Sequence, residues 1–184
     1  QHKRYRFGNQ AEIALWNLYQ LANALYPLIE EAKPLEEILD AFSMDYQKEY
    51  LDMMRNKLGL QIKKEDDAVL IESLTQLLQL IETDMTIFFR KLSSVTKVNS
   101  AEDAFNTIKD AFYNEKELNE TILKEWKEWF GEYSIRIDEE ALLDTERKEK
   151  MDRVNPKYVL RNYMAQLCID AADKGDYTLL NELY

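Results

Sequence analysis

The sequence contains very few of the residues on which most enzyme chemistry depends. Its 184 residues include one histidine, His2, one cysteine, Cys168, and only four glycines. A Ser-His-Asp triad, a zinc-binding helix and the Glu-x-x-His pairs of di-iron bundles all need histidines that the chain lacks. A single cysteine cannot form a thiolate zinc site, and four separate glycines form neither a dinucleotide-binding motif nor a P-loop. We therefore expect no catalytic, cofactor-binding or metal-binding residue in this chain.

The scarcity of turn-forming residues predicts the fold class. The chain has four glycines and three prolines, whereas the tight turns between strands favour Gly, Pro, Asn and Asp. Hydrophobic residues make up 46% of the sequence, which is too apolar for a disordered chain. We expect an all-α fold, an irregular bundle of about seven to nine helices that forms a single domain over residues 1–184.

The charge and the lone cysteine restrict partners and location. The formal net charge is −11, and phosphate backbones and anionic membrane surfaces attract clustered Lys and Arg instead. This charge argues against a nucleic-acid partner and against a membrane partner. A membrane-spanning helix is also not expected, because no run of about 18 uncharged apolar residues is present. One cysteine excludes an internal disulfide and fits a reducing compartment. Cys168 itself is interpreted as a small buried residue on a helix.

The first half of the sequence shows strong helical periodicity. A first helix should open at Asn9 with a capping box, and Pro27 should kink or end it near Tyr26. A second should start at Pro34, bury a long apolar stripe and stop at Gly59. The segment 68–83 is apolar nearly all round, so we expect a helix buried on most sides.

The second half predicts shorter helices and one charged stretch. Asp84 and Ser100 are expected to cap two short helices, and a longer helix should cover 115–137 with Trp126 and Trp129 in the core. The stretch 138–152 should be an exposed helix or a mobile connection. Its carboxylates Glu139, Glu140 and Asp144 could bind a divalent cation, although a solvated face is the preferred interpretation.

Two strings resist a purely structural interpretation. One is Lys3-Arg4-Tyr5-Arg6-Phe7-Gly8-Asn9-Gln10 with the following Trp16-Asn17-Leu18, and the other is Asn155-Pro156-Lys157-Tyr158-Val159-Leu160-Arg161-Asn162-Tyr163 with its continuation to Gln166. In the second, Asn155 should cap a helix that has Pro156 at its first position. Polar side chains among core residues should be buried or interfacial, with satisfied hydrogen bonds. The candidate motif residues are Arg4, Tyr5, Asn9, Gln10, Trp16, Asn17, Asn155, Pro156, Arg161 and Asn162.

These strings resemble the C-terminal region of the selenoprotein O family, the kinase-like protein adenylyltransferases. That family shows G-R-Y-x-F-x-N-Q-P followed by W-N-L, and near its end N-P-x-x-V-L-R-N-Y-x-A-Q followed by A-x-x-G-D. Gly175-Asp176 completes the second pattern here. Lys3 stands where the family has glycine, and Ala11 where it has proline.

The resemblance implies a part of a kinase-like helical lobe. Family members transfer AMP from ATP to hydroxyl side chains of proteins with Mg²⁺ or Mn²⁺, through N-T-D-N-like and D-Y-G-P-like stretches that precede the first string. Because neither stretch occurs here, no catalytic, cofactor-binding or metal-binding residue is carried over. The implied partners are the missing N-terminal catalytic half and the protein substrates of the parent enzyme. The implied location is the bacterial cytoplasm, or the mitochondrion of a eukaryote. The implied task is to brace the catalytic lobe, and the surface that packs on the missing half should be exposed and apolar.

The alternative is a free-standing helical module that binds other proteins through a groove. Such a module should begin with an initiating Met and finish with a polar tail. This sequence begins at Gln1 and ends in the apolar pattern Leu179, Leu180, Leu183, Tyr184. We therefore expect a portion of a larger protein adenylyltransferase that performs no catalysis alone.

Overall fold

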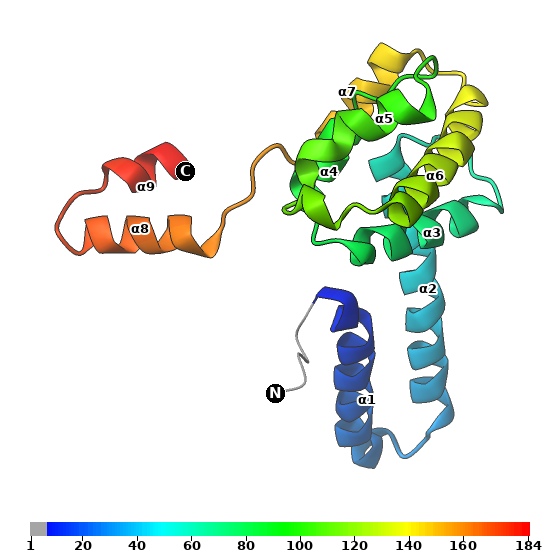
Figure 1. The fold of residues 1–184 in the computed structure, drawn as a ribbon. Helices are drawn as coiled ribbons and strands as arrows, with labels where there is room; N and C mark the ends of the chain where they lie inside the picture. Colours follow the sequence, from blue (N-terminus) through cyan, green and yellow to red (C-terminus); the bar gives the residue numbers. More distant parts are fainter. Residues whose placement is uncertain (1–6) are drawn as a thin grey trace.

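The computed structural model describes residues 7–184, and within that range the chain is all-α, with nine α-helices and no strand. Figure 1 shows a helical body, a hairpin formed by the first two helices, and a pair of short helices set apart from the body. The helices are α1 (Gln10–Ile29), α2 (Lys33–Leu58), α3 (Asp67–Leu80), α4 (Met85–Leu92), α5 (Ala101–Ile108), α6 (Glu120–Asp138), α7 (Asp144–Val154), α8 (Asn162–Ala172) and α9 (Thr178–Leu183). Short 3₁₀ turns cover Phe7–Asn9, Lys109–Ala111 and Glu115–Glu117.

Helices α1 and α2 form the antiparallel hairpin of Figure 1, and its ends follow local chemistry. Helix α1 begins at Gln10 as expected, but the side chain of Asn9 makes no cap hydrogen bond. Pro27 lies in the last turn of α1, which ends at Ile29, slightly later than the predicted end near Tyr26, and the backbone leaves the helix at Glu30 with φ 61°. Pro34 lies in the first turn of α2, and Gly59 ends α2 with φ 74°, both as predicted.

The predicted buried stripe of α2 is confirmed only at its C-terminal end. Met54 and Leu58 are buried in the body, whereas Ile38 is 66% exposed and Tyr46 44% exposed. The sequence pattern is amphipathic along the whole helix, but only the last turns of α2 reach the body. The first half of α2 packs against α1 alone among the described helices.

The body encloses one hydrophobic core, built from α3–α7 and the end of α2. Trp126 is fully buried at its centre, with the rings of Phe88, Phe112 and Phe130 within 6.0 Å of its own. Trp129 is also buried, so both tryptophans are core residues as predicted. Asp84 and Ser100 cap α4 and α5 with their side chains, which confirms both cap predictions.

Two helices of the body differ from the sequence prediction. The long helix expected over 115–137 starts only at Glu120, because Asn119 accepts a cap hydrogen bond from the amide of Ile122. Helix α3 ends at Leu80 and buries a single face, since Val69 is 66% exposed. The expectation of burial on most sides was wrong, because α3 packs against α2 and α6 and leaves its remaining side uncovered.

The charged stretch 138–152 is largely an ordered helix. Helix α7 covers Asp144–Val154 and buries Arg147 and Met151 completely. The predicted helix at Asn155-Pro156 is absent: Asn155 ends α7, the segment 156–161 is not helical, and α8 begins at Asn162. Residues 156–184, which we call the C-terminal arm, contain α8 and α9, and Cys168 is buried there on a helix as predicted.

Candidate functional site

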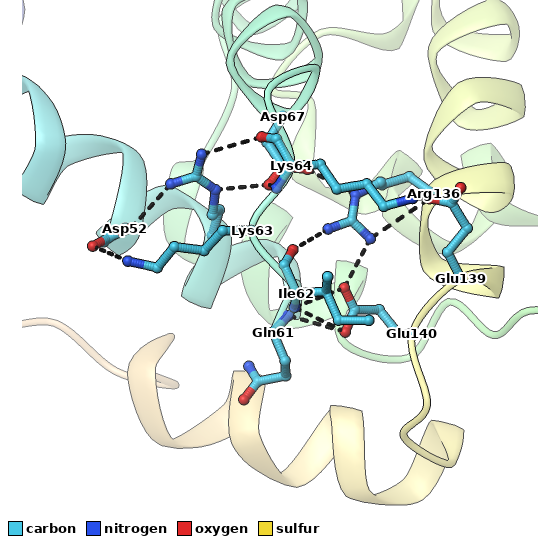
Figure 2. Close-up of polar contacts among 10 residues, drawn as sticks. Asp52, Gln61, Ile62, Lys63, Lys64, Asp67, Arg136, Glu139 and Glu140 are labelled. Carbon is cyan, nitrogen blue, oxygen red and sulfur yellow. Dashed lines mark hydrogen bonds and ion pairs between the residues drawn. The ribbon is translucent and has the colours of Figure 1, made fainter.

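The strongest concentration of polar contacts is a buried charge cluster beside the connection between α2 and α3. The carboxylate of Asp67, the first residue of α3, accepts hydrogen bonds from Nε of Arg55 and from Nε of Arg136, each at 2.7 Å (Figure 2). The amide of Lys64 donates to the same carboxylate at 2.9 Å. Asp67 is fully buried and Arg136 is 7% exposed. The cluster therefore ties α2, α3 and α6 together.

The other end of Arg136 is also occupied. Its Nη1 donates to Glu140 at 2.8 Å, and Nη2 donates to the carbonyl of Ile62. Glu140, 3% exposed, also accepts the amides of Gln61 and Ile62 at 3.1 and 3.2 Å (Figure 2). Because both carboxylate oxygens are occupied, Glu140 serves as a backbone clamp on the 61–62 segment.

Electrostatics keep this cluster charged. Burial acts to raise the pKa of Asp67, but hydrogen bonds from Arg136, the Lys64 amide and Arg55 hold it below its ordinary value. Burial acts to lower the pKa of Arg136. The hydrogen bonds and negative charges of Asp67 and Glu140 outweigh this effect, so the pKa of Arg136 is raised. A carboxylate that is ionised and fully paired is a poor general acid or base. The cluster is therefore a structural clamp.

A second buried arginine holds α7 against the body. Arg147 is fully buried and donates to the Tyr133 hydroxyl at 3.0 Å and to the carbonyl of Val95. Tyr133 in turn donates to the carbonyl of Leu58 at 2.8 Å, and burial raises its pKa to about 12. The phenol therefore stays neutral across the physiological pH range and acts as a hydrogen-bond relay.

Asn155 is a buried tether rather than a helix cap. It is fully buried, its Nδ2 donates to the carbonyl of Lys57 at 2.9 Å, and its Oδ1 accepts the Lys57 ammonium at 3.0 Å. Arg90 of α4 donates to the Asn155 carbonyl at 3.1 Å. The cap prediction was wrong because the side-chain amide of Asn155 is hydrogen-bonded to Lys57, 98 positions away in the sequence, and therefore caps no helix.

Asp84 joins the C-terminal arm to the body. Its Oδ1 accepts the amides of Thr86 and Ile87, while its Oδ2 accepts the Tyr113 hydroxyl at 3.0 Å and Nη2 of Arg161 at 2.7 Å. Burial acts to raise the pKa of Asp84, and these hydrogen bonds together with the Arg161 charge hold it below its ordinary value. Arg161 thus has an ion-pair partner in this chain, although its side chain is 45% exposed. Asn162, the first residue of α8, is exposed.

Within residues 7–184, α1 and α8, the helices that carry parts of the two strings, lie apart (Figure 1). Arg4 and Tyr5 lie outside the described residues. Asn9 and Gln10 mark the start of α1, where Trp16 is 49% exposed and Asn17 is exposed. Pro156 is exposed in the connection before α8.

Sequence reasoning missed the charge cluster. The signal was the i, i+4 spacing of Arg136 and Glu140, which is typical of helical ion pairs, but their burial depends on a loop about 75 positions earlier in the chain.

Among the described residues, the carboxylates singled out in the sequence form no metal-binding group. Within residues 7–184, no group of three or more His, Cys, Asp or Glu is placed to hold a metal ion. Asp144 accepts the amide of Lys97, and Glu139 pairs with Lys64, so the predicted carboxylates are not gathered at one point. In the same described range, no helix combines the length and the hydropathy needed to cross a lipid bilayer.

Comparison with known proteins gives one consistent result. The family model described as protein adenylyltransferase SelO matches residues 1–184. A protein nucleotidyltransferase YdiU from Flavobacterium johnsoniae is 58% identical over 184 residues, which are all of this chain and 35% of that protein. Its namesake from Aromatoleum aromaticum is 44% identical over 185 residues, 98% of this chain and 34% of that protein. The one from Rhodopirellula baltica is 42% identical over 195 residues, all of this chain and 36% of that protein. The chain therefore spans about a third of the length of these bacterial relatives.

Proposed function

We propose, from the premise that this chain belongs to the protein adenylyltransferase SelO family, that it is the C-terminal helical part of a protein nucleotidyltransferase and braces the part that carries the chemistry. The parent protein would transfer AMP from ATP to hydroxyl side chains of proteins with Mg²⁺ or Mn²⁺. The partners of this chain would be that catalytic part and, through it, the protein substrates. Because the relatives are bacterial and one cysteine suits a reducing compartment, the proposed location is the bacterial cytoplasm.

The observation that carries this proposal is a contrast in packing. The body buries its aromatic core and pairs its buried Asp67, Arg136 and Glu140, so it has the rigidity of a platform. The hairpin and the C-terminal arm instead expose large apolar side chains, among them Leu28 at 81% and Leu160 at 68%. Isolated exposed apolar residues are ordinary, but contiguous faces mark interaction sites.

The chemistry proposed for the parent makes a brace useful. Nucleotide transfer is largely positioning and electrostatic stabilisation, so groups that hold the phosphates and metal gain from a stiff support. Since the N-T-D-N-like and D-Y-G-P-like stretches do not occur in this sequence, we assign no step of the transfer to this chain. A free-standing adaptor would use the same exposed faces, but family membership and a length one third that of the relatives favour the brace.

A separated-parts experiment tests the proposal. The full-length protein, the full-length protein without this segment, this chain alone, and the two parts mixed are each assayed for transfer of labelled AMP from ATP with Mg²⁺ to protein acceptors. We expect activity in the full-length protein, none in either part alone, and recovery in the mixture or on co-expression. Full activity without this segment would contradict the bracing role. Micromolar, metal-dependent ATP binding by this chain alone, measured by calorimetry, would contradict the assignment of the nucleotide site elsewhere.

A further inference from the structure

Helix α1 has the composition of a buried helix but not the surroundings of one. Its twenty residues contain a single charged side chain, Glu12, and none of the twenty is buried. Within the described chain the main contacts of α1 are with α2 and with the short turn before it. A helix that is apolar or neutral on all sides is normally enclosed by other elements. Part of the natural surroundings of α1 is therefore absent from residues 7–184.

The exposed side of the second half of α1 has a regular composition. Successive helical residues are separated by about 100°, so residues seven apart share a side. Tyr19 and Tyr26, 54% and 47% exposed, form one edge, and Leu21 and Leu28, 54% and 81% exposed, form the other. Between these edges lie the exposed amides Gln20 and Asn23. We call these six residues the outer face of α1; it contains no charge.

The uncharged amides help to define the occupant. Solvated helix faces are normally rich in Lys, Glu, Arg and Asp, as α7 illustrates with the exposed Glu146, Glu149 and Lys150. Gln20 and Asn23 can instead donate and accept hydrogen bonds without the desolvation cost of burying an ion. Two tyrosines and two leucines around such amides match the make-up of an interface core, where charge is depleted and aromatics are enriched.

We infer that the outer face of α1 is buried, in the full-length protein, against an uncharged surface of the part of the same polypeptide that lies outside residues 1–184. This inference rests on the proposed function. The relatives are about three times as long as this chain, so a covering segment is available in the same molecule at high effective concentration. A second copy of this chain is the competing occupant, and the test separates the two.

Hydroxyl-radical footprinting of the unmodified proteins is the first measurement. Oxidation of Tyr19 and Tyr26 is compared between this chain at low micromolar concentration and the full-length protein, with Trp126 as the buried reference in both. We expect oxidation of the two tyrosines to fall roughly fivefold in the full-length protein, as their exposure drops to that of an interface core. Equal oxidation in both proteins would overturn the inference. Protection that develops only as the concentration of either protein rises would also overturn it, in favour of a second copy.

A charge placed on the outer face supplies the second measurement. Leu21→Glu should change the unfolding equilibrium of this chain by less than about threefold, because the site is exposed. In the full-length protein it should raise the unfolded fraction by on the order of 100-fold, because the carboxylate would be buried without a partner. Ile135→Glu on α6, where Ile135 is 70% exposed, is the matched control and should stay below about threefold in both. A Leu21→Glu effect of equal size in both proteins would count against the inference.

The two proposals can fail separately. A full-length protein that transfers AMP while Tyr19 and Tyr26 stay fully accessible would overturn the docking of α1 and leave the bracing role standing. Protection of both tyrosines in a full-length protein that transfers no nucleotide would support the docking of α1 and contradict the proposed activity.

Discussion

At the scale of single residues, the buried polar groups carry much of the specificity of this fold. Asp67, Arg136, Glu140 and Arg147 are charged and buried, and each has partners on a different segment of the chain. Burying an ion pair gains little compared with an apolar pair, but removing one partner is strongly destabilising. These residues therefore fix which helices meet and at which register.

Asn155 allows a direct test of one tether. Asn155→Ala should lower the free energy of unfolding by about 1–3 kcal/mol, because the Lys57 carbonyl loses its buried donor. Asn162→Ala is the control: it removes an exposed amide and should stay within about 0.5 kcal/mol. Urea denaturation of both variants checks this. Equal midpoints for Asn155→Ala and for the unmodified chain would contradict the tether.

The charge cluster predicts acid sensitivity with a defined sign. The pKa of Asp67 in the folded chain lies below its ordinary value of 3.8, so the unfolded chain binds the proton more readily. The stabilisation is complete above pH 3.8 and is lost as the pH falls from there through the lower folded pKa. Asp67→Asn should abolish this part of the pH dependence and destabilise the chain at neutral pH. Chemical denaturation at pH 2.5–7 checks this, and parallel profiles for the two proteins would refute it.

At the scale of elements, the end of α2 depends on one glycine. Gly59 has φ 74°, and a Cβ there would meet the Met151 sulfur at 2.7 Å and the Arg147 Cγ at 2.8 Å. Gly59→Ala should therefore cost about 1–3 kcal/mol from the backbone strain alone, with the clash adding to it.

Gly131→Ala is the matched control for that change. Gly131 lies inside α6 with nothing within 4 Å of an added Cβ, so alanine should stabilise the chain by about 0.5–1 kcal/mol through helix propensity. Thermal melts of the two variants should move in opposite directions. A neutral Gly59→Ala would show that the left-handed turn is not required.

Local signals predicted the elements whose ends are set by their own neighbours. Asp84, Ser100 and Gly59 each interact within a few residues, and the structure confirms all three. The prediction failed where a distant segment decides. Asn155-Pro156 fits a helix start locally, but Lys57 occupies its amide. The stretch 138–152 is mostly helical, which agrees with one of its two expected forms, but the burial of Arg147 was missed because its partners lie on α6 and beyond α4.

The apolar pattern of the hairpin misled for another reason. The stripe of α2 and the whole of α1 read as core, yet Ile38 and Leu28 are exposed within the described chain. An amphipathic pattern predicts that a face is covered but does not identify the covering element. Under the proposed bracing role, that element would lie outside this chain.

At the scale of the whole molecule, stability should be uneven. The body has a continuous aromatic core, whereas the C-terminal arm is joined to it through the connection 156–161 and the Arg161–Asp84 pair. Regions with few buried contacts open locally at low free energy. We expect amide protection in α6 to exceed that in α8 by on the order of 100-fold or more.

Hydrogen exchange with mass spectrometry measures this difference. Arg161→Ala should speed exchange across 156–172 and leave α6 unchanged, and Lys157→Ala, which removes a nearby cation without a partner on the body, is the control. Equal protection in α6 and α8 would show that the arm is as firmly held as the body.

Helix α2 has a mechanical consequence at this same scale. It runs 26 residues without a break, about 39 Å at 1.5 Å per residue. One end carries α1, and the other is anchored by Met54, Leu58 and the Gly59 turn. A push or pull on α1 therefore reaches the Arg55–Asp67 contact through a single stiff rod, and α2 acts as a lever whose fulcrum is the charge cluster.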